Sequence, residues 1–257
     1  MKKLIACGLA FASALTAPAG AQSAKPTIVL VHGAFADSSS WNGVITILER
    51  DGYHVVAAPN PLRGVRADAD VVADVVKSIG SPVVLVGHSY GGSVISEAAE
   101  GQGNVKALVY VAAFAPDAGE TAKGLTGKFP GSTLGPALAP AVKLTGGGSD
   151  LYILQARFHD QFAADVPAPA ARLMAAGQRP IAAAALSEAS TQPAWKHMPS
   201  WFIYGDRDKN IPPAALGFMA KRAGSRQTVV VNGASHVIMV SHAPAVAALI
   251  EKAAMAH

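Results

Sequence analysis

A serine lies between two glycines in the pattern G-x-S-x-G at residues 87–91 of this 257-residue chain. A serine hydroxyl is a weak nucleophile at neutral pH, so chemistry at Ser89 requires an imidazole that accepts its proton and a carboxylate that orients the imidazole. Such a set of side chains attacks carbonyl groups and forms an acyl intermediate. The rest of the chain must therefore bring one histidine and one acid to Ser89.

The residues around Ser89 predict a strand, a sharp turn and a helix. Residues 83–86, Val-Val-Leu-Val, are a continuous apolar run typical of a strand buried on both faces of a parallel sheet. From Tyr90 onward the apolar spacing is helical, and Gly101 is available to end the helix. A turn this tight strains the serine backbone and leaves no room for side chains at Gly87 and Gly91. The N-terminus of the helix would then favour an oxyanion beside the serine.

A second loop, at residues 32–35, is predicted to lie beside Ser89. The apolar run 27–31 ends in His-Gly-Ala-Phe at residues 32–35. Open α/β sheets bind ligands where such a loop follows the carboxyl end of a strand. We expect one oxyanion N–H from Ala34, with Phe35 as the next choice, and the other from Tyr90. Alternatively, His32 and Gly33 form only a tight turn with a packed histidine.

The whole pattern predicts an α/β fold with a mostly parallel central sheet flanked by helices, in one domain of residues 22–257. Alternating strands and helices are typical of doubly wound parallel sheets. The predicted strands are 27–31, 53–58, 83–86, 105–113, 201–204 and 228–231. The predicted helices lie near 41–52, 67–79, 90–101, 212–224 and 244–254.

A long insertion interrupts this alternation before the last two strands. Its composition is rich in Ala, Pro and Gly, with weak helical runs near 151–163, 168–177 and 180–190. We interpret residues 117–199, approximately, as a helical cap over the active site. Packing inside the cap would explain each of its large apolar side chains, but they are also candidate pocket walls. The predicted substrate-binding residues are Phe35 from the first loop and Phe129, Phe158 and Trp195 from the cap, with Tyr152, Phe162 and Met174 as further candidates.

The chain order Ser, acid, His is the one expected around such a serine turn. The acid must follow a strand beyond the cap, which leaves Asp206 and Asp208. The histidine must follow the last strand, which selects His236 over His242, because His242 lies farther on near the last helix. The other histidines considered fall too early in the chain or lie in the cap: His54, His88, His159 and His197.

Several stretches also carry a resemblance to a known family: 30–34 (Leu-Val-His-Gly-Ala), 87–92 (Gly-His-Ser-Tyr-Gly-Gly), 112–117 (Ala-Ala-Phe-Ala-Pro-Asp), 208–212 (Asp-Lys-Asn-Ile-Pro) and 233–236 (Gly-Ala-Ser-His). In these the chain resembles the α/β-hydrolase superfamily, and within it the small esterases related to plant methyl-salicylate esterases and hydroxynitrile lyases. The family pattern D-K-x-I-P implies that Asp208, and not Asp206, is the acid. The resemblance thus implies catalytic roles for Ser89, Asp208 and His236.

The resemblance favours hydrolysis over lyase chemistry. The lyases of this branch carry Thr where this chain has Gly33, and Lys where it has Val237. A lysine there would stabilise a departing cyanide, which Val237 cannot do. We expect cleavage of small or medium carboxylic esters through an acyl-enzyme, with a small-molecule ester as the partner. Lyase, lactone, amide or C–C bond cleavage are alternatives with the same side chains. A binding protein that kept a hydrolase shell is a further alternative, against which the complete Ser, Asp and His set argues.

The first residues predict a secretory signal peptide at 1–21. Two lysines precede the apolar run 4–17, and a small-x-small cleavage site ends at Ala21. The run is shorter than the roughly 20 residues that a membrane span needs, so no stable membrane insertion is expected. Cys7 lies in a lipobox-like context, but too few residues precede it for a lipoprotein signal. The mature protein is expected to be periplasmic or secreted.

Composition excludes several other classes of function. Cys7 is the only cysteine, so the mature chain can use no thiol and form no disulfide. The formal charge of +4 falls to about +2 without the signal peptide, which is too weak to suggest nucleic acid as a partner. Residues 87–92 do not match G-x-G-x-x-G, and the histidines lack paired metal spacing. Neither a cofactor nor a metal is therefore expected.

Overall fold

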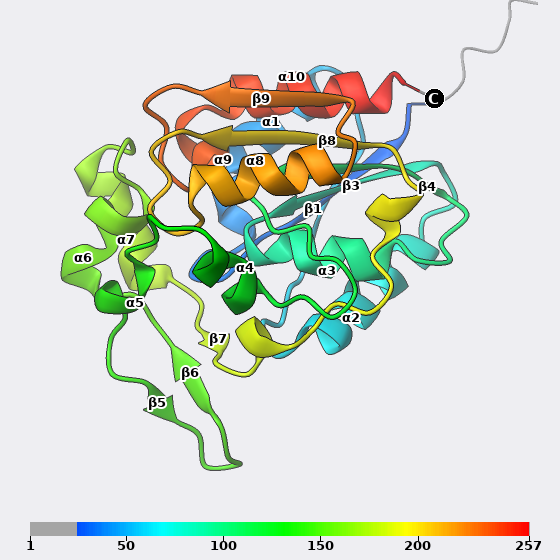
Figure 1. The fold of residues 1–257 in the computed structure, drawn as a ribbon. Helices are drawn as coiled ribbons and strands as arrows, with labels where there is room; N and C mark the ends of the chain where they lie inside the picture. The colour runs from blue at the N-terminus through cyan, green and yellow to red at the C-terminus, as the bar shows by residue number, and fades with distance from the viewer. Residues whose placement is uncertain (1–24, 257) are drawn as a thin grey trace, which may run out of the picture.

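The computed structural model describes residues 25–256, so the predicted signal peptide lies outside the described residues. A six-stranded parallel sheet forms the centre of the fold, in the order β2-β1-β3-β4-β8-β9 (Figure 1). Its strands are β1 (Thr27–Val31), β2 (Val55–Ala58), β3 (Val83–His88), β4 (Val105–Val111), β8 (Ser200–Gly205) and β9 (Gln227–Val231). Neighbouring parallel strands must be joined by long crossover connections, usually helices, and the sequence predicts such helices between the strands. The predicted fold class is therefore confirmed.

Helices cover both faces of the sheet. The helices of the body are α1 (Asn42–Arg50), α2 (Val65–Lys77), α3 (Tyr90–Ala98), α8 (Pro213–Arg222), α9 (Ile238–Ser241) and α10 (Ala243–Ala254), with the 3-10 turn η1 (Ser38–Trp41). α1 packs against α10 on one face, whereas α2 and α3 pack together on the other (Figure 1). None of the helices in residues 25–256 is long and apolar enough to cross a membrane.

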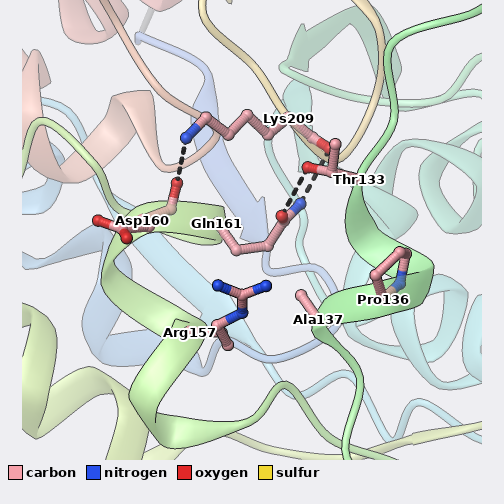
Figure 2. Close-up of a pocket in the computed structure, with 7 residues that line it drawn as sticks. All are labelled: Thr133, Pro136, Ala137, Arg157, Asp160, Gln161 and Lys209. Carbon is pink, nitrogen blue, oxygen red and sulfur yellow. Dashed lines mark hydrogen bonds between the residues drawn. The ribbon is translucent and has the colours of Figure 1, made fainter.

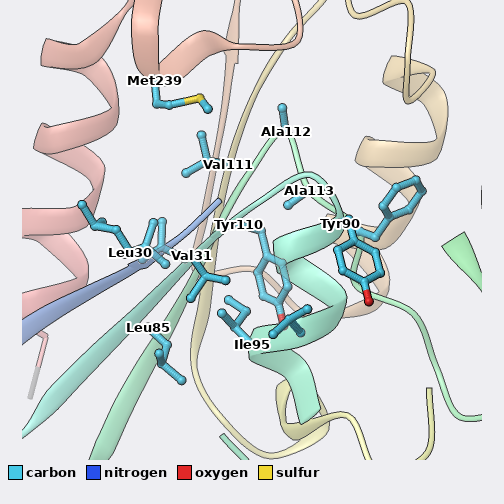
Figure 3. Close-up of a cluster of buried hydrophobic side chains, with 14 of the residues drawn as sticks. Leu30, Val31, Leu85, Tyr90, Ile95, Tyr110, Val111, Ala112, Ala113 and Met239 are labelled. Atoms are coloured by element: carbon cyan, nitrogen blue, oxygen red, sulfur yellow. The ribbon is translucent and has the colours of Figure 1, made fainter. Parts of the chain in front are cut away.

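The apolar runs of the sequence form the core between these layers. Every residue of β1 and β3 is buried, as expected for central strands covered on both faces. Figure 3 shows Leu85 of β3, Ile95 of α3 and Tyr110 of β4 among the buried side chains of this core. The Tyr110 ring stacks on Phe202 of β8 with a centroid separation of 4.5 Å. This packing fixes the positions of the strand ends, from which the loops of the site begin.

Residues 117–199, which we call the cap, lie between β4 and β8. The cap contains α4 (Ala122–Lys128), α5 (Leu134–Ala137), α6 (Gln155–Phe162), α7 (Ala168–Gly177), the turns η2 (Ala185–Ser187) and η3 (Ala194–Lys196), and the strands β5 (Val142–Lys143), β6 (Ser149–Leu151) and β7 (Ile181–Ala182). α5, α6 and α7 lie beyond the carboxyl ends of β8 and β9, and the β5–β6 hairpin projects away from the body (Figure 1).

The cap is less helical than the sequence predicts. The expected helical run 180–190 is wrong, because it forms β7 and the turn η2. β7 pairs with β6, which also pairs with β5, in an antiparallel sheet that the sequence did not reveal. Strands of two or three residues show no readable periodicity, so pairing with neighbours decides their conformation.

Candidate active site

Ser89 occupies the sharp turn between β3 and α3. Its backbone has φ 54° and ψ −124°, a left-handed conformation that is rare outside glycine. The end of β4 and the loop after it fix this turn: the Ser89 N–H donates to the carbonyl of Val111 at 3.2 Å, and the Ser89 carbonyl accepts from the Phe114 N–H at 3.1 Å. Backbone strain of this kind persists only where surrounding structure imposes it.

The glycines around Ser89 are required by close backbone contacts. A Cβ added to Gly91 would lie 2.6 Å from the carbonyl oxygen of Val31, and one added to Gly87 would lie 2.6 Å from the carbonyl oxygen of Gly91. α3 can therefore approach β1 only because these positions have no side chain. The expectation that no side chain fits at Gly87 and Gly91 is met.

The structure brings together the three side chains that the sequence singles out. His236 Nε2 lies 2.9 Å from Ser89 Oγ, and His236 Nδ1 lies 2.6 Å from Asp208 Oδ2. All three residues are buried. Since a carboxylate only accepts, Nδ1 carries the proton toward Asp208 and leaves Nε2 free to accept the proton of Ser89. The arrangement can activate the serine hydroxyl as a nucleophile.

The loop after β8 presents Asp208 and turns Asp206 elsewhere. Asp208 Oδ1 accepts from the N–H groups of Asn210 at 2.8 Å and Ile211 at 2.9 Å, which directs its other oxygen to His236. Asp206 instead accepts from the Gly233 N–H at 2.7 Å. Of the two acids that the sequence left open, the structure thus places Asp208 beside the histidine.

A cap residue, Gln161 of α6, holds the two residues that follow Asp208, and Figure 2 shows its bonds to Lys209 and Thr133. Its Nε2 donates to the Lys209 carbonyl at 2.9 Å and to Asn210 Oδ1 at 2.8 Å, and its Oε1 accepts from Thr133 Oγ1 at 2.8 Å. A surface cavity of about 380 Å³ lies beside these groups. The cap therefore contributes to the position of the Asp208 loop.

Two backbone N–H groups remain free beside Ser89. Within residues 25–256, the N–H groups of Ala34 and Tyr90 donate to no other group. The Phe35 N–H, which was the second choice, donates to the Arg179 carbonyl at 3.0 Å. Ala34 and Tyr90 both line the cavity beside Ser89. They are thus available as donors to an oxyanion there.

The side chain of Tyr90 connects this turn to α2. Its hydroxyl donates to Asp68 Oδ2 at 2.8 Å, and Asp68 also accepts from the N–H groups of Arg63 and Gly64. Burial, together with the neighbouring Asp68, raises the pKa of Tyr90 above its usual value, so the phenol remains a donor. Burial also raises the pKa of Asp68.

His88 supports the backbone of His236. Its Nε2 lies 3.1 Å from the His236 carbonyl oxygen, and its ring centroid is 4.8 Å from that of His236. A carbonyl only accepts, so His88 Nε2 carries the proton. Burial, and the nearby His236, lower the pKa of His88 well below its usual value, so it remains neutral. Within residues 25–256 no three His, Cys, Asp or Glu side chains gather where they could hold a metal ion.

A cavity of about 500 Å³ opens beside Ser89, His236 and the two free N–H groups. This size is typical of small-molecule sites. Its polar residues include Lys123 and Thr126 of α4 and Asn210. Its apolar lining residues come from both the body and the cap: Ala34, Phe35, Phe114, Ala122, Leu134, Leu138, Leu151, Phe162, Ala183, Leu186 and Ile211. The cavity suits a mostly apolar molecule that carries a group for Ser89 to attack.

The predicted wall residues differ in outcome. Phe35 lines the cavity, as does Phe162, whereas Phe129, Phe158 and Trp195 lie outside its lining. Phe158 packs behind Phe162 at a centroid distance of 4.9 Å, and Phe129 packs on Phe218 at 5.3 Å. Trp195 Nε1 donates to the Pro116 carbonyl at 2.8 Å. Composition alone cannot show whether an aromatic side chain of the cap points into the cavity or packs elsewhere.

Several wall residues were missed by the sequence reasoning. Phe114 lies in the loop after β4, three residues past its end at Val111, so the rule that selected the other loops at the strand ends could have found it. The cap leucines had no such signal, because their positions depend on how the cap folds: Leu134, Leu138, Leu151 and Leu186.

Comparisons with known proteins find relatives in sequence and in fold. The "Alpha/beta hydrolase nvfD" of Aspergillus novofumigatus is 28% identical over 251 residues, which cover 90% of this chain and 97% of that protein. Polyneuridine aldehyde esterase has a similar structure, with a TM-score of 0.76 at 19% identity over 89% of this chain and 98% of its own. An extracellular alpha/beta-hydrolase from a Paenibacillus species gives a TM-score of 0.70 at 23% identity over 89% of this chain and 98% of its own. These two structures show a shared fold.

The model of the alpha/beta hydrolase family matches residues 28–249. The match extends from β1 into α10 and so includes every strand of the central sheet, both loops beside Ser89 and the cap. The chain therefore belongs to the alpha/beta hydrolase family.

Proposed function

We propose that this α/β-hydrolase is a serine carboxylesterase that cleaves small or medium carboxylic esters. The observation that carries the proposal is the hydrogen-bonded chain from Asp208 through His236 to Ser89, which ends at a mostly apolar cavity of about 500 Å³. A nucleophile with its base in contact, beside free N–H donors and a cavity, is suited to acyl transfer. The esterase names of similar structures support the same reaction class.

In the proposed first step, Ser89 Oγ attacks the ester carbonyl while His236 Nε2 takes its proton. Asp208 holds the imidazole in the required tautomer and stabilises its positive charge. The N–H groups of Ala34 and Tyr90 donate to the oxyanion of the tetrahedral intermediate. His236 then protonates the leaving alcohol, which departs and leaves the acyl group on Ser89.

In the second step, His236 takes a proton from a water molecule that attacks the acyl-enzyme. The same N–H groups stabilise the second oxyanion, and His236 returns the proton to Ser89 as the acid is released. His236 thus transfers every proton, and the mechanism uses only these three side chains, the two backbone N–H groups and water.

The loop after β1 argues against lyase chemistry with the same side chains. A Cβ at Gly33 would lie 2.6 Å from the Cβ of Ser89 and 2.7 Å from the His88 carbonyl oxygen. The threonine found at this position in the related lyases therefore does not fit here without a shift of the loop. Val237, at the position of the lyase lysine, is fully buried and carries no charge.

The proposal is tested with p-nitrophenyl esters from acetate to octanoate, assayed with the mature protein and its Ser89→Ala variant. Removal of the nucleophile should lower kcat by roughly 10⁴-fold or more while circular dichroism shows an unchanged fold. Asp206→Asn is the control, because this acid is near the site but bonds to Gly233. Turnover that survives in Ser89→Ala would remove Ser89 from the mechanism.

We also propose that residues 1–21 direct export and that the mature enzyme acts in the periplasm or outside the cell. The basis is the two lysines, the apolar run and the Ala-Gly-Ala site in the sequence. N-terminal sequencing of the exported protein should begin just after Ala21. An intact N-terminus on protein that remains in the cytoplasm would contradict it.

A further inference from the structure

Two cavities meet at Phe35. The first is the cavity beside Ser89, and the second, of about 250 Å³, lies between the loop before α1 and helix α7. Phe35 is the one residue that both linings share in the described part of the chain. Its position, directly after Ala34, places this division next to the N–H group proposed to bind the oxyanion.

Phe35 is held firmly in this position. Its φ of 61° lies in the left-handed region, which a bulky residue adopts only where the surroundings impose it. Its N–H donates to the Arg179 carbonyl at 3.0 Å. Its ring packs edge-on against Phe162 with a centroid distance of 6.1 Å, and the residue is only 4% exposed. Phe35 is therefore held in place where the linings of the two cavities meet.

The second cavity is suited to a hydrocarbon chain. Its apolar walls include the side chains of Ala36, Met174 and Val240, and its polar lining residues are Asp37, Ser39, Ser40 and Gln178. Leu173 of α7 also lines it and is 76% exposed, an unusual position for a large apolar side chain. Exposed apolar groups that border an apolar hollow are typical of ligand-binding grooves. The acyl or alcohol part of an ester, which we call an arm, would bury this surface if it were long and apolar.

We propose that Phe35 sets the length limit of the substrate by closing the Ser89 cavity against the second cavity. The inference rests on the proposed esterase activity. The arm of the ester that points toward the loop after β1 must end at the Phe35 ring. A smaller side chain at position 35 would join the cavities and admit a longer arm.

The test compares the wild-type protein with Phe35→Leu and Phe35→Ala on esters of increasing length. One series lengthens the acyl group of p-nitrophenyl esters from acetate to myristate, and the other lengthens the alcohol of acetate esters. In one series, the ratio of kcat/KM for the longest to the shortest ester should rise about tenfold or more, since apolar contacts of added methylenes accumulate. The series that responds identifies the arm that faces Phe35. If Phe35→Ala does not fold, Phe35→Leu gives the same comparison with a smaller change.

A second substitution tests the route of the longer arm. Ala170 is exposed on α7 and lines the second cavity but not the first. Ala170→Trp should fill the second cavity and abolish the gain when combined with Phe35→Ala. The single Ala170→Trp variant is the reference for any effect on α7 itself. A gain that persists in the double variant would overturn the proposal, because the arm would then pass elsewhere.

Binding without turnover separates this proposal from the esterase proposal. In the Ser89→Ala background, 1-dodecanol should bind about tenfold more tightly when Phe35 is also replaced by Ala, as measured by calorimetry. Equal affinities, or unchanged length profiles in both ester series, would show that Phe35 does not divide the cavities. If the wild-type protein hydrolyses no ester while dodecanol binding responds as expected, the esterase proposal fails and the partition stands.

Discussion

The hydroxyl of Tyr90 donates a 2.8 Å hydrogen bond to Oδ2 of Asp68, and so ties the residue whose N–H faces the cavity to helix α2. Tyr90→Phe should lower kcat about threefold to tenfold at nearly constant KM, because a less well-held N–H stabilises the oxyanion less in the transition state. It should also lower the free energy of unfolding by about 1–3 kcal/mol.

Tyr110→Phe is the matched control for this prediction. Tyr110 also has a buried hydroxyl, 2.8 Å from Ser96 Oγ, but it lies in the core and not at the cavity. It should show a comparable loss of stability with unchanged kcat. Equal changes of kcat in both variants would mean that Tyr90 acts only through stability. The measurements are steady-state kinetics and urea unfolding.

Asp208→Asn should lower kcat by roughly 10³–10⁴-fold, because an amide can stabilise the wrong tautomer of His236 and cannot stabilise its charged form. Asp206→Asn should leave kcat nearly unchanged, since Asp206 accepts from Gly233 and does not touch His236. Steady-state kinetics on p-nitrophenyl acetate distinguishes the two acids. A large loss in Asp206→Asn with normal activity in Asp208→Asn would reverse the assignment.

Gly92→Ala should destabilise the protein by about 1–3 kcal/mol through overpacking. A Cβ there would collide with the Phe114 carbonyl oxygen and lie 2.8 Å from the Cβ of Ala113, in the loop that fixes the Ser89 turn. Gly80→Ala is the control, because no heavy atom lies within 4 Å of its added Cβ. Thermal unfolding should show a lower Tm for Gly92→Ala alone. Equal Tm values for Gly92→Ala and Gly80→Ala would show that the loop after β4 shifts to accommodate the added methyl group without loss of stability.

Glu97 is expected to make stability dependent on pH in the acid range. Burial alone would raise the pKa of Glu97, but hydrogen bonds from Ser190, Thr191 and Gln192 outweigh burial and bring the pKa below its usual 4.5. A lowered pKa in the folded state stabilises the protein above pH 4.5, and this stabilisation is lost as the pH falls through the folded pKa.

The measurement is urea unfolding of the wild-type protein and Glu97→Gln between pH 7 and pH 3. The free energy of unfolding of the wild-type protein should exceed that of Glu97→Gln most near neutral pH, and this difference should shrink below pH 4.5. Glu49→Gln, at an exposed carboxylate of α1, controls for general charge effects. An advantage of Glu97 that is constant over the whole range would contradict the prediction.

The sheet and the Ser89 turn could be predicted because their signals are local. An apolar run followed by glycines at fixed spacing has few conformations that bury it well, and β3 and α3 follow that pattern. The partners of Ser89 could be narrowed by topology, since the carboxyl ends of parallel strands share one edge. The choice of Asp208 over Asp206 needed the family resemblance, because two acids that are two residues apart follow the same strand.

The rest depends on contacts between distant parts of the chain. The bond of His88 to the His236 carbonyl joins residues 148 apart in the sequence, so no local pattern could reveal it. Phe158 and Phe162 lie on the same helix, yet only Phe162 reaches the cavity. Such differences arise from the packing of the cap on the body, which local sequence patterns do not predict.

The separation of Ser89, Asp208 and His236 along the chain also makes activity a measure of complete folding. Ser89 and His236 are 147 residues apart, and Asp208 precedes His236 by 28. We expect contacts this distant to form late, because long loops must close before such contacts stabilise the chain. An intermediate with only β1 to β4 in place has the serine turn but no base. Hydrolysis regained during refolding should therefore follow the docking of β8 and β9, and lag behind the recovery of helical circular dichroism.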